Sequence, residues 1–182
     1  MINEHQIFII AAVDEEFGIG KNNDLAWNYP SDMQHFQTTT TNVETPGLQN
    51  AVIMGRNTWE SLPAKFQPLP DRYNVVLTSD LNFQPSGADV APSLEEAFAM
   101  ADLPDVERIF VIGGASVYAE AMKNERVDGI YLTHISGTHD CDVFFPAVDE
   151  RFSEVETLKH SEENGHELEF SLYTKEIEED EE

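Results

Sequence analysis

The sequence predicts an α/β protein in which helices cover both faces of one mostly parallel β-sheet. Apolar runs of strand length alternate with helical segments through the middle of the chain, which is typical of parallel sheets. Near the end of the chain, two alternating segments flank Asn164 and Gly165, so we expect an antiparallel hairpin at one edge of the sheet. With 182 residues, of which 41% are apolar, the chain suits a single domain.

Turn and capping residues mark the limits of the predicted elements. Pro30 suits the first turn of a helix, where Ser31 and Asp32 are expected to cap exposed backbone N–H groups. Ser93 and Glu96 have the spacing of a capping box. Runs rich in β-branched and aromatic residues mark the strands. In chain order we expect a strand over 6–13, a loop over 14–28, a helix over 31–39, a strand over 51–54, a short helix over 57–62, a strand over 73–77, a helix over 93–101, a strand over 108–112, a helix ending near 122, and strands over 129–135, 151–160 and 167–175.

The net charge is strongly negative, because 10 Lys and Arg stand against 35 Asp and Glu, which gives −25. Nucleic acid is excluded as a partner, since no cluster of basic residues is present to neutralise phosphates. The acids are spread along the chain, and their mutual repulsion is screened at molar salt. We therefore expect a salt-adapted (halophilic) protein; the alternative is an acidic surface for a basic partner. Residues 176–182 read as an acidic, disordered tail behind a domain over 1–175.

The cellular setting follows from cysteine usage and from the apolar segments. The single cysteine, Cys141, cannot form an internal disulfide, which fits a reducing compartment. Asp140 and Asp142 beside it oppose thiolate formation. No apolar run has the length of a membrane span, and the start of the chain does not read as an export signal. We expect a soluble cytoplasmic protein without a membrane partner.

Two strand-to-helix turns are candidate phosphate sites. Gly55, Arg56, Asn57 and Thr58 directly follow a predicted strand, so backbone N–H groups and a hydroxyl could hold a phosphate there. The segment 113–118 repeats this arrangement with two adjacent glycines. Each signal alone is weak, since a glycine at such a turn is common. Two of them suggest a dinucleotide, although neither has the spaced three-glycine fingerprint of the Rossmann fold.

For other polar residues, an ordinary structural role competes with a functional one. Arg72 suits a ligand carboxylate, yet pairing with one of the many acids is favoured from the sequence alone. Thr133 lies in a predicted strand, and its neighbour His134 points to the opposite face. The histidines lack the spacing of a zinc site, so we expect no metal.

Asp32 is the most informative acid of the chain. As a first-turn residue of a helix, it has an ordinary reading as a cap. Met33 and Phe36 lie on or next to the same helical face, and Trp27 precedes it by five residues. A carboxylate among such side chains is poorly solvated and would bind a partner that offers two parallel N–H donors.

Taken together, these residues resemble dihydrofolate reductase from about Ile7 to Lys175. The order of the matching segments makes the resemblance specific. They are Ala11 and Ala12, Gly18 to Gly20, Trp27 with Pro30 and Asp32, Val52 to Trp59, Leu69 and Arg72, Val111 to Tyr118, and Tyr131 to Ile135. The resemblance implies a three-layer fold with an eight-stranded mixed sheet and four helices, working as a monomer. It also implies NADPH as cofactor and reduction of 7,8-dihydrofolate by hydride transfer to C6 with protonation of N5.

The resemblance also implies a role for each matching residue. Asp32, Trp27 and Tyr118 would be catalytic. The implied substrate-binding residues are Ile10, Asp32, Met33, Phe36, Leu62, Leu69, Arg72, Ile112 and Thr133. The implied cofactor-binding residues are Ala12, Ile19, Gly20, Gly55, Arg56, Asn57, Thr58, Leu77, Thr78, Ser79, Gly113, Gly114, Ala115, Ser116, Val117 and Tyr118. Gly113 and Gly114 would be joined by a non-proline cis peptide bond.

Some positions depart from the pattern of the family. Ser79, Asp80 and Ser116 stand where relatives often carry an arginine near the adenosine 2′-phosphate, so Arg56 is the remaining cation. Ala26 stands where proline is common, and Cys141 where glycine is common. Two rival readings stay open. One is a related reductase of riboflavin biosynthesis, and the other is a catalytically inactive, acidic nucleotide-binding protein.

Overall fold

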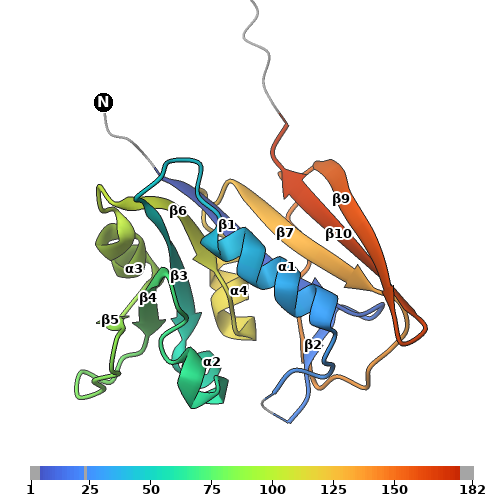
Figure 1. The fold of residues 1–182 in the computed structure, drawn as a ribbon, viewed down its shortest axis with the longest axis horizontal. Coiled ribbons are helices and arrows are strands. Elements are labelled where there is room, and N and C mark those ends of the chain that lie inside the picture. Colours follow the sequence, from blue (N-terminus) through green and yellow to red (C-terminus); the bar gives the residue numbers. More distant parts are fainter. Residues whose placement is uncertain (1–4, 23, 177–182) are drawn as a thin grey trace, which may run out of the picture.

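The computed structural model describes residues 5–22 and 24–176 and confirms the predicted α/β fold (Figure 1). One large sheet has eight strands in the order β5-β4-β3-β6-β1-β7-β10-β9, and a second sheet pairs β2 with β8. The strands are β1 Gln6–Val13, β2 Gly18–Gly20, β3 Gln49–Gly55, β4 Arg72–Leu77, β5 Asp89–Ala91, β6 Val106–Val111, β7 Gly129–Ile135, β8 Val143–Phe144, β9 Glu154–Glu163 and β10 His166–Thr174. The helices are α1 Pro30–Thr41, α2 Arg56–Ser61, α3 Leu94–Ala101 and α4 Ala115–Met122, with a 3₁₀ turn over Ala64–Phe66.

The sheet is parallel from β5 to β7 and antiparallel at the other edge, where β10 joins β7 to β9. The connection between β9 and β10 is a two-residue turn. Asn164 and Gly165 both have positive φ values, 49° and 77°, as a tight hairpin turn of this kind requires. The antiparallel hairpin expected from the sequence is therefore confirmed.

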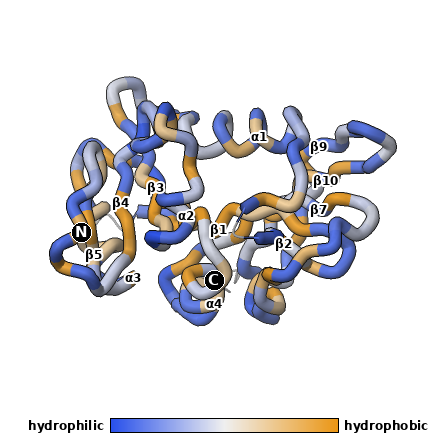
Figure 2. The backbone as a smooth tube through the Cα atoms, turned by 90° about the horizontal axis from the view of Figure 1, so that it is seen from below, coloured by the Kyte–Doolittle hydropathy of each residue, from blue (hydrophilic) through white to orange (hydrophobic). Residues whose placement is uncertain are grey.

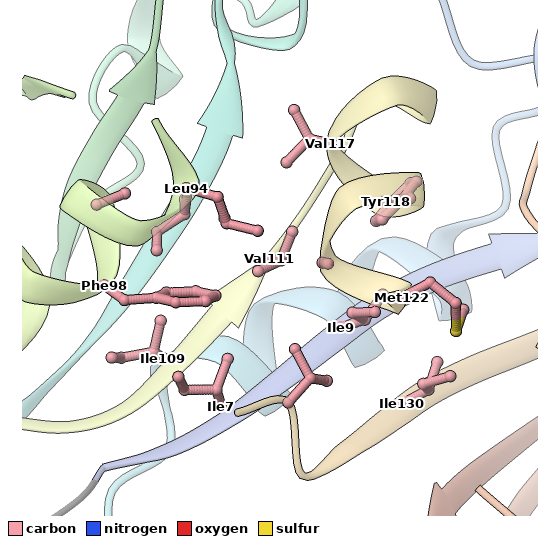
Figure 3. Close-up of a cluster of buried hydrophobic side chains, with 14 of the residues drawn as sticks. Ile7, Ile9, Leu94, Phe98, Ile109, Val111, Val117, Tyr118, Met122 and Ile130 are labelled. Atoms are coloured by element: carbon pink, nitrogen blue, oxygen red, sulfur yellow. The ribbon is translucent and has the colours of Figure 1, made fainter. Parts of the chain in front are cut away.

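Two apolar layers lie on opposite faces of the large sheet, and alternation along β1 feeds both of them. Ile7 and Ile9 point toward α3 and α4, where they meet side chains such as Phe98 and Met122 (Figure 3). Phe8 and Ile10 face the other way and pack in the layer that α1 and α2 cover. Seen along the sheet, α1 and α4 lie on opposite sides of β1 (Figure 2). The sheet is thus the middle of three layers, which fixes the positions of the strand ends.

The start of α1 differs from the prediction. The N-cap residue is Tyr29 rather than Ser31 or Asp32, and no side chain of the cap accepts a hydrogen bond from the helix. Pro30 occupies the first turn as expected. Asp32 lies within the first turn, so its carboxylate is not used as a cap. By contrast, Ser93 caps α3 as predicted, accepting from the backbone N–H of Glu96 at 3.2 Å.

The shortest strands were not predicted. The β5 strand has three residues and β8 has two, and β2 lies inside the segment 14–28 that was expected to be a loop. Strands of this length carry no alternation that a sequence pattern can reveal, because they form only where a neighbouring strand offers an edge. No helix in the described part of the chain is long and apolar enough to cross a membrane. The predicted acidic tail lies, from residue 177 on, outside the described residues.

Candidate functional site

The two predicted phosphate turns lie side by side at the carboxyl ends of β3 and β6. The backbone N–H of Gly55 donates to the carbonyl oxygen of Gly113 at 2.8 Å. The N–H of Ile112, the residue before Gly113, donates to the carbonyl of Ile53 at 2.9 Å. A Cβ placed on Gly114 would lie 3.5 Å from the hydroxyl oxygen of Thr58. Ligands of open α/β sheets bind beyond such strand ends, so the carboxyl ends of β3 and β6 are the candidate binding site.

The glycines of these turns are required by close approach and by backbone conformation. Gly113 has φ +123°, and a Cβ there would lie 3.2 Å from the hydroxyl oxygen of Tyr118. At Gly55 a Cβ would lie 3.2 Å from a methyl carbon of Val117. The peptide bond between Gly113 and Gly114 is cis, as the resemblance implied. Both turns therefore keep bare backbone at the strand ends.

Tyr118 ties the ends of two strands together. This residue lies on α4, is buried, and its hydroxyl donates to the carbonyl oxygens of Ile10 and Ile112, each 2.8 Å away. Burial raises the pKa of the phenol above its ordinary value, and the charge of Asp32 adds to the effect. The phenol therefore stays protonated and acts as a fixed donor at the base of the site.

Arg56 is already engaged by acidic side chains. Its Nε donates to Glu60 and its Nη1 to Asp80, each at 2.9 Å, while the guanidinium lies 4.2 Å from the centre of the Phe83 ring. These two carboxylates raise the pKa of the guanidinium. A ligand phosphate that binds Arg56 has to compete with both of them.

The remaining residues predicted to bind the cofactor lie on several elements. Leu77 is the last residue of β4, and the N–H of Thr78 donates to the carbonyl of Ala91 at 3.0 Å. Ile19 and Gly20 belong to β2, where a Cβ on Gly20 would lie 2.9 Å from the carbonyl oxygen of Asp24. The other predicted members are Ala12 in β1, the exposed Asn57, Ser79 and Ser116, and Ala115 and Val117 in α4.

Asp32 stands in the first turn of α1 with few partners. The indole N–H of Trp27 lies 3.4 Å from its Oδ2, and within the described ranges it is the one side-chain donor to this carboxylate. Burial raises the pKa of the carboxyl to about 6, the negative charge of Glu163 adds to this, and the indole hydrogen bond opposes it. The carboxylate is poorly solvated and retains capacity to accept hydrogen bonds.

An apolar cluster adjoins this carboxylate on the α1 face of the sheet. Five of the predicted substrate contacts, Ile10, Phe36, Leu62, Leu69 and Ile112, belong to it. Met33 does not, because 45% of its surface is exposed. Of the three side chains predicted around Asp32, Trp27 donates to it, Phe36 belongs to the apolar cluster and Met33 is exposed.

Arg72 is buried without an acidic partner in the described part of the chain, which contradicts the ion pair favoured from the sequence. Its Nε donates to the carbonyl of Pro70 and its Nη1 to the hydroxyl of Thr40, both at 2.9 Å. Burial lowers the pKa of the guanidinium. A buried cation held by neutral acceptors favours an incoming carboxylate.

Thr133 lies buried in the middle of β7, opposite Ala12 of β1. His134 faces away from it, as predicted, and its Nε2 lies 2.8 Å from the hydroxyl of Tyr173. Among the described residues no group of three or more His, Cys, Asp or Glu side chains is arranged to hold a metal ion.

Some contacts that shape the site gave no signal in the sequence. Asp14 accepts hydrogen bonds from the N–H groups of Gly18 at 2.8 Å and His139 at 2.9 Å, so it joins the loop after β1 to the segment before β8. Burial raises the pKa of Asp14, but the backbone hydrogen bonds outweigh it and the pKa is lowered. Cys141 packs against Gly18, and burial with the nearby Asp14 raises the thiol pKa to about 11. Glu163 reaches α1 from a strand 132 residues further along the chain.

Comparison with known proteins gives one consistent family. A model of the family described as dihydrofolate reductase matches residues 6–175. The dihydrofolate reductase of Drosophila melanogaster is 41% identical over 175 residues, which cover 92% of this chain and 96% of the relative. That of Sus scrofa is 39% identical over 178 residues, covering 91% and 96%. The solved structure of Schistosoma mansoni dihydrofolate reductase aligns with a TM-score of 0.81 at 38% identity, covering 96% of this chain and 100% of that chain.

The chain therefore belongs to the dihydrofolate reductase family and is an enzyme of that family.

Proposed function

We propose that this member of the dihydrofolate reductase family catalyses the NADPH-dependent reduction of 7,8-dihydrofolate to 5,6,7,8-tetrahydrofolate. The observation that carries the proposal is Asp32, a poorly solvated carboxylate with one indole donor beside an apolar cluster. Such a carboxylate suits the 2-amino group and N3 of a pterin, which offer two parallel N–H donors. Family membership favours this reaction over the related reductase of riboflavin biosynthesis.

The adjoining glycine turns fit a dinucleotide cofactor. Gly55, Gly113 and Gly114 expose backbone at two strand ends, and a Cβ at Gly55 or Gly113 would crowd the neighbouring side chains. Thr58 and the first turn of α4 would supply hydroxyl and N–H donors to the phosphates. When bound, the reduced nicotinamide supplies the hydride that C6 of the pterin receives. Arg56 is the cation for a 2′-phosphate, against the competition of its two carboxylates.

Proton transfer to N5 of the pterin accompanies the reduction. Asp32 would hold the pyrimidine side of the ring and raise the basicity of N5 through the ring system, while a water molecule is the immediate donor. Direct proton donation from Asp32 to N5 is disfavoured, because the carboxylate would bind the pyrimidine edge of the pterin, away from N5. Trp27 would help to orient that water and the carboxylate, and the hydroxyl of Thr133 would bridge beside Asp32.

The apolar cluster would bind the rest of the substrate, and Arg72 would take the α-carboxylate of its glutamate tail. Arg72 uses Nε and one N–H of Nη1, which leaves the second N–H of Nη1 and both of Nη2 for a ligand. Met33, half of whose surface faces solvent, would cover the substrate from above only once it is bound. The segment 14–28 would close over the nicotinamide and exclude water, a gating role.

The working form is a monomer in a salt-rich cytoplasm, with residues 1–175 as one domain. Cys141 is a free thiol, as in reducing compartments. The charge of −25 supports salt adaptation, because repulsion among spread acids weakens when salt screens it. A melting temperature that does not rise across a potassium chloride series would contradict this part of the proposal.

Asp32→Asn is the test of the proposed reaction. The variant should lower kcat for dihydrofolate at neutral pH by about 10²-fold or more, because the neutral amide cannot polarise the pterin ring. Binding of NADPH, followed by fluorescence, should change little. Glu120→Gln removes the same charge from an exposed position on α4 and serves as the control. Activity of Asp32→Asn equal to that of the control would overturn the assignment.

A further inference from the structure

Glu163, the last residue of β9, contacts the first turn of α1. Its Oε1 accepts a hydrogen bond from the backbone N–H of Ser31 at 2.9 Å. The hairpin tip and the start of α1 lie at the same end of the molecule (Figure 1). This contact joins the edge of the sheet to the helix that carries Asp32.

No side chain of its own segment caps the first turn of α1. Its cap residue, Tyr29, offers no side-chain hydrogen bond to the helix. The first N–H groups of a helix need acceptors, and a negative charge there is favourable because it meets the positive end of the helix dipole. Glu163 supplies both the acceptor and the charge.

The same turn is held from a second direction. The hydroxyl of Tyr29 lies 2.7 Å from Nε2 of His139, while the N–H groups of Asp32 and Met33 donate to the carbonyl of Tyr29 at 3.0 and 3.1 Å. Asp32 is therefore one residue from the Glu163 contact and bonded to the residue that His139 holds. A shift of this turn would carry the Asp32 carboxylate with it.

The charge of Glu163 also remains uncompensated near Asp32. Its Oε2 is buried and has no hydrogen-bond partner within the described ranges, and it forms no ion pair there. The groups that influence Asp32 are Glu163 from β9, the Trp27 indole before α1 and the Tyr118 phenol from α4. Glu163 is the one anion among them, and it adds to burial in raising the pKa of Asp32.

We propose that Glu163 is a positioning residue for dihydrofolate reduction, which fixes the first turn of α1 so that the Asp32 carboxylate is directed at the pterin edge. Glu163 would contact neither C6 nor N5 of the pterin, and it would act through Ser31 and Asp32. The inference rests on the proposed function, since that function gives Asp32 its role toward the substrate.

Two substitutions at this position separate its hydrogen bond from its charge. Glu163→Ala removes both, and we expect kcat/KM for dihydrofolate to fall about tenfold with KM for NADPH unchanged. Glu163→Gln keeps a carbonyl acceptor for Ser31, so most of kcat/KM should return. In Glu163→Gln the pH profile of kcat/KM should move to lower pH, because a negative neighbour of Asp32 has been lost. Glu162→Gln, at the exposed preceding residue, is the matched control and should behave as the unmodified enzyme.

Hydrogen exchange of the Ser31 amide gives a readout that does not depend on activity. Its protection should fall in Glu163→Ala and persist in Glu163→Gln and in the control. Unchanged protection in Glu163→Ala, or a pH profile of Glu163→Gln that overlays that of Glu162→Gln, would overturn the inference. Full activity of Asp32→Asn would instead overturn the role of Asp32, and failure of the unmodified protein to reduce dihydrofolate would overturn the proposed function. Both outcomes leave the exchange result valid. If Glu163→Ala does not fold, the pH profile of Glu163→Gln alone decides.

Discussion

The two halves of the site are built in different ways. The proposed cofactor half consists mainly of backbone, where Gly55 and Gly113 bring two strand ends within one hydrogen bond of each other. The proposed pterin half consists of side chains brought together over long distances, with Asp32 close to Trp27 and Glu163 bound to the neighbouring Ser31. The backbone turns of the first half are determined by residues close together in the sequence. The side chains of the second half come together only when the edge of the sheet packs against α1.

The largest effect is expected in the backbone half, from Gly113→Ala. An alanine at φ +123° is strained, and its Cβ would lie 3.2 Å from the hydroxyl of Tyr118, which cannot move without losing two hydrogen bonds. We expect a loss of about 2–4 kcal/mol in the free energy of unfolding, measured by urea denaturation.

Gly47→Ala is the control for that experiment. Gly47 also has a positive φ, +90°, but nothing lies within 4 Å of a Cβ there. Gly47→Ala should lower the free energy of unfolding by about 1 kcal/mol, because only the backbone strain of alanine at positive φ remains. Equal losses at the two positions would show that the approach of Tyr118 does not restrict the turn.

The local half of the site could be predicted because its signals lie in contiguous residues. A strand followed at once by Gly55 or Gly113 indicates a turn at a strand end, and parallel strands place those ends at one edge. The same reasoning identified β1, β7, the capping by Ser93 and the hairpin turn at Asn164. In each case the chemistry that decides the structure lies within a few residues.

The other half could be predicted only in part. Asp32 was singled out, but as a cap or a ligand, and the side-chain acceptor for the first turn is in fact Glu163, 132 residues from Ser31. Arg72 was expected to pair with an acid, whereas burial places neutral acceptors around it. A sequence gives the charged residues of a protein but not the distances between them. Hydrogen-bond and ion-pair partners that are far apart in the chain therefore cannot be predicted from it.

An effect of intermediate size is expected on the free energy of unfolding, which the buried Asp32 carboxylate lowers in the ligand-free protein. Burial raises the pKa of Asp32 from its ordinary value of 3.8 to about 6, so the folded protein binds the proton more tightly than the unfolded chain does. Its ionisation therefore destabilises the ligand-free protein progressively as pH rises from about 4 to 6. Asp32→Asn should be more stable than the unmodified protein by about 1–2 kcal/mol at pH 7 to 8, with the difference vanishing below pH 4.

Thermal unfolding of both proteins across this pH range checks the prediction. Burial lowers the pKa of His35 to about 4, which destabilises the folded state as pH falls below 6.5. That contribution is common to both proteins and cancels in their difference. A pH-independent difference would mean that the Asp32 carboxyl is well solvated.

The smallest effect is expected at Arg56, where the backbone half meets a side-chain network. Asp80→Asn frees one of the two carboxylate contacts of Arg56, so KM for NADPH should fall about threefold relative to KM for NADH. Glu120→Gln again controls for the change in net charge. An unchanged ratio of the two KM values would show that Arg56 does not contact the 2′-phosphate, and a rise would show that Asp80 orients Arg56 rather than competing for it.

Asp32 is a poorly solvated carboxylate that can accept hydrogen bonds from a two-donor partner. Titration of its side-chain carboxyl carbon by ¹³C NMR in the ligand-free protein tests this most directly, with the resonance assigned by its loss in Asp32→Asn. The structure predicts a midpoint of about 6, and addition of a pterin should lower it as the ionised form is bound. A midpoint close to 3.8, unaffected by the pterin, would show that the carboxylate is well solvated and does not bind the pterin.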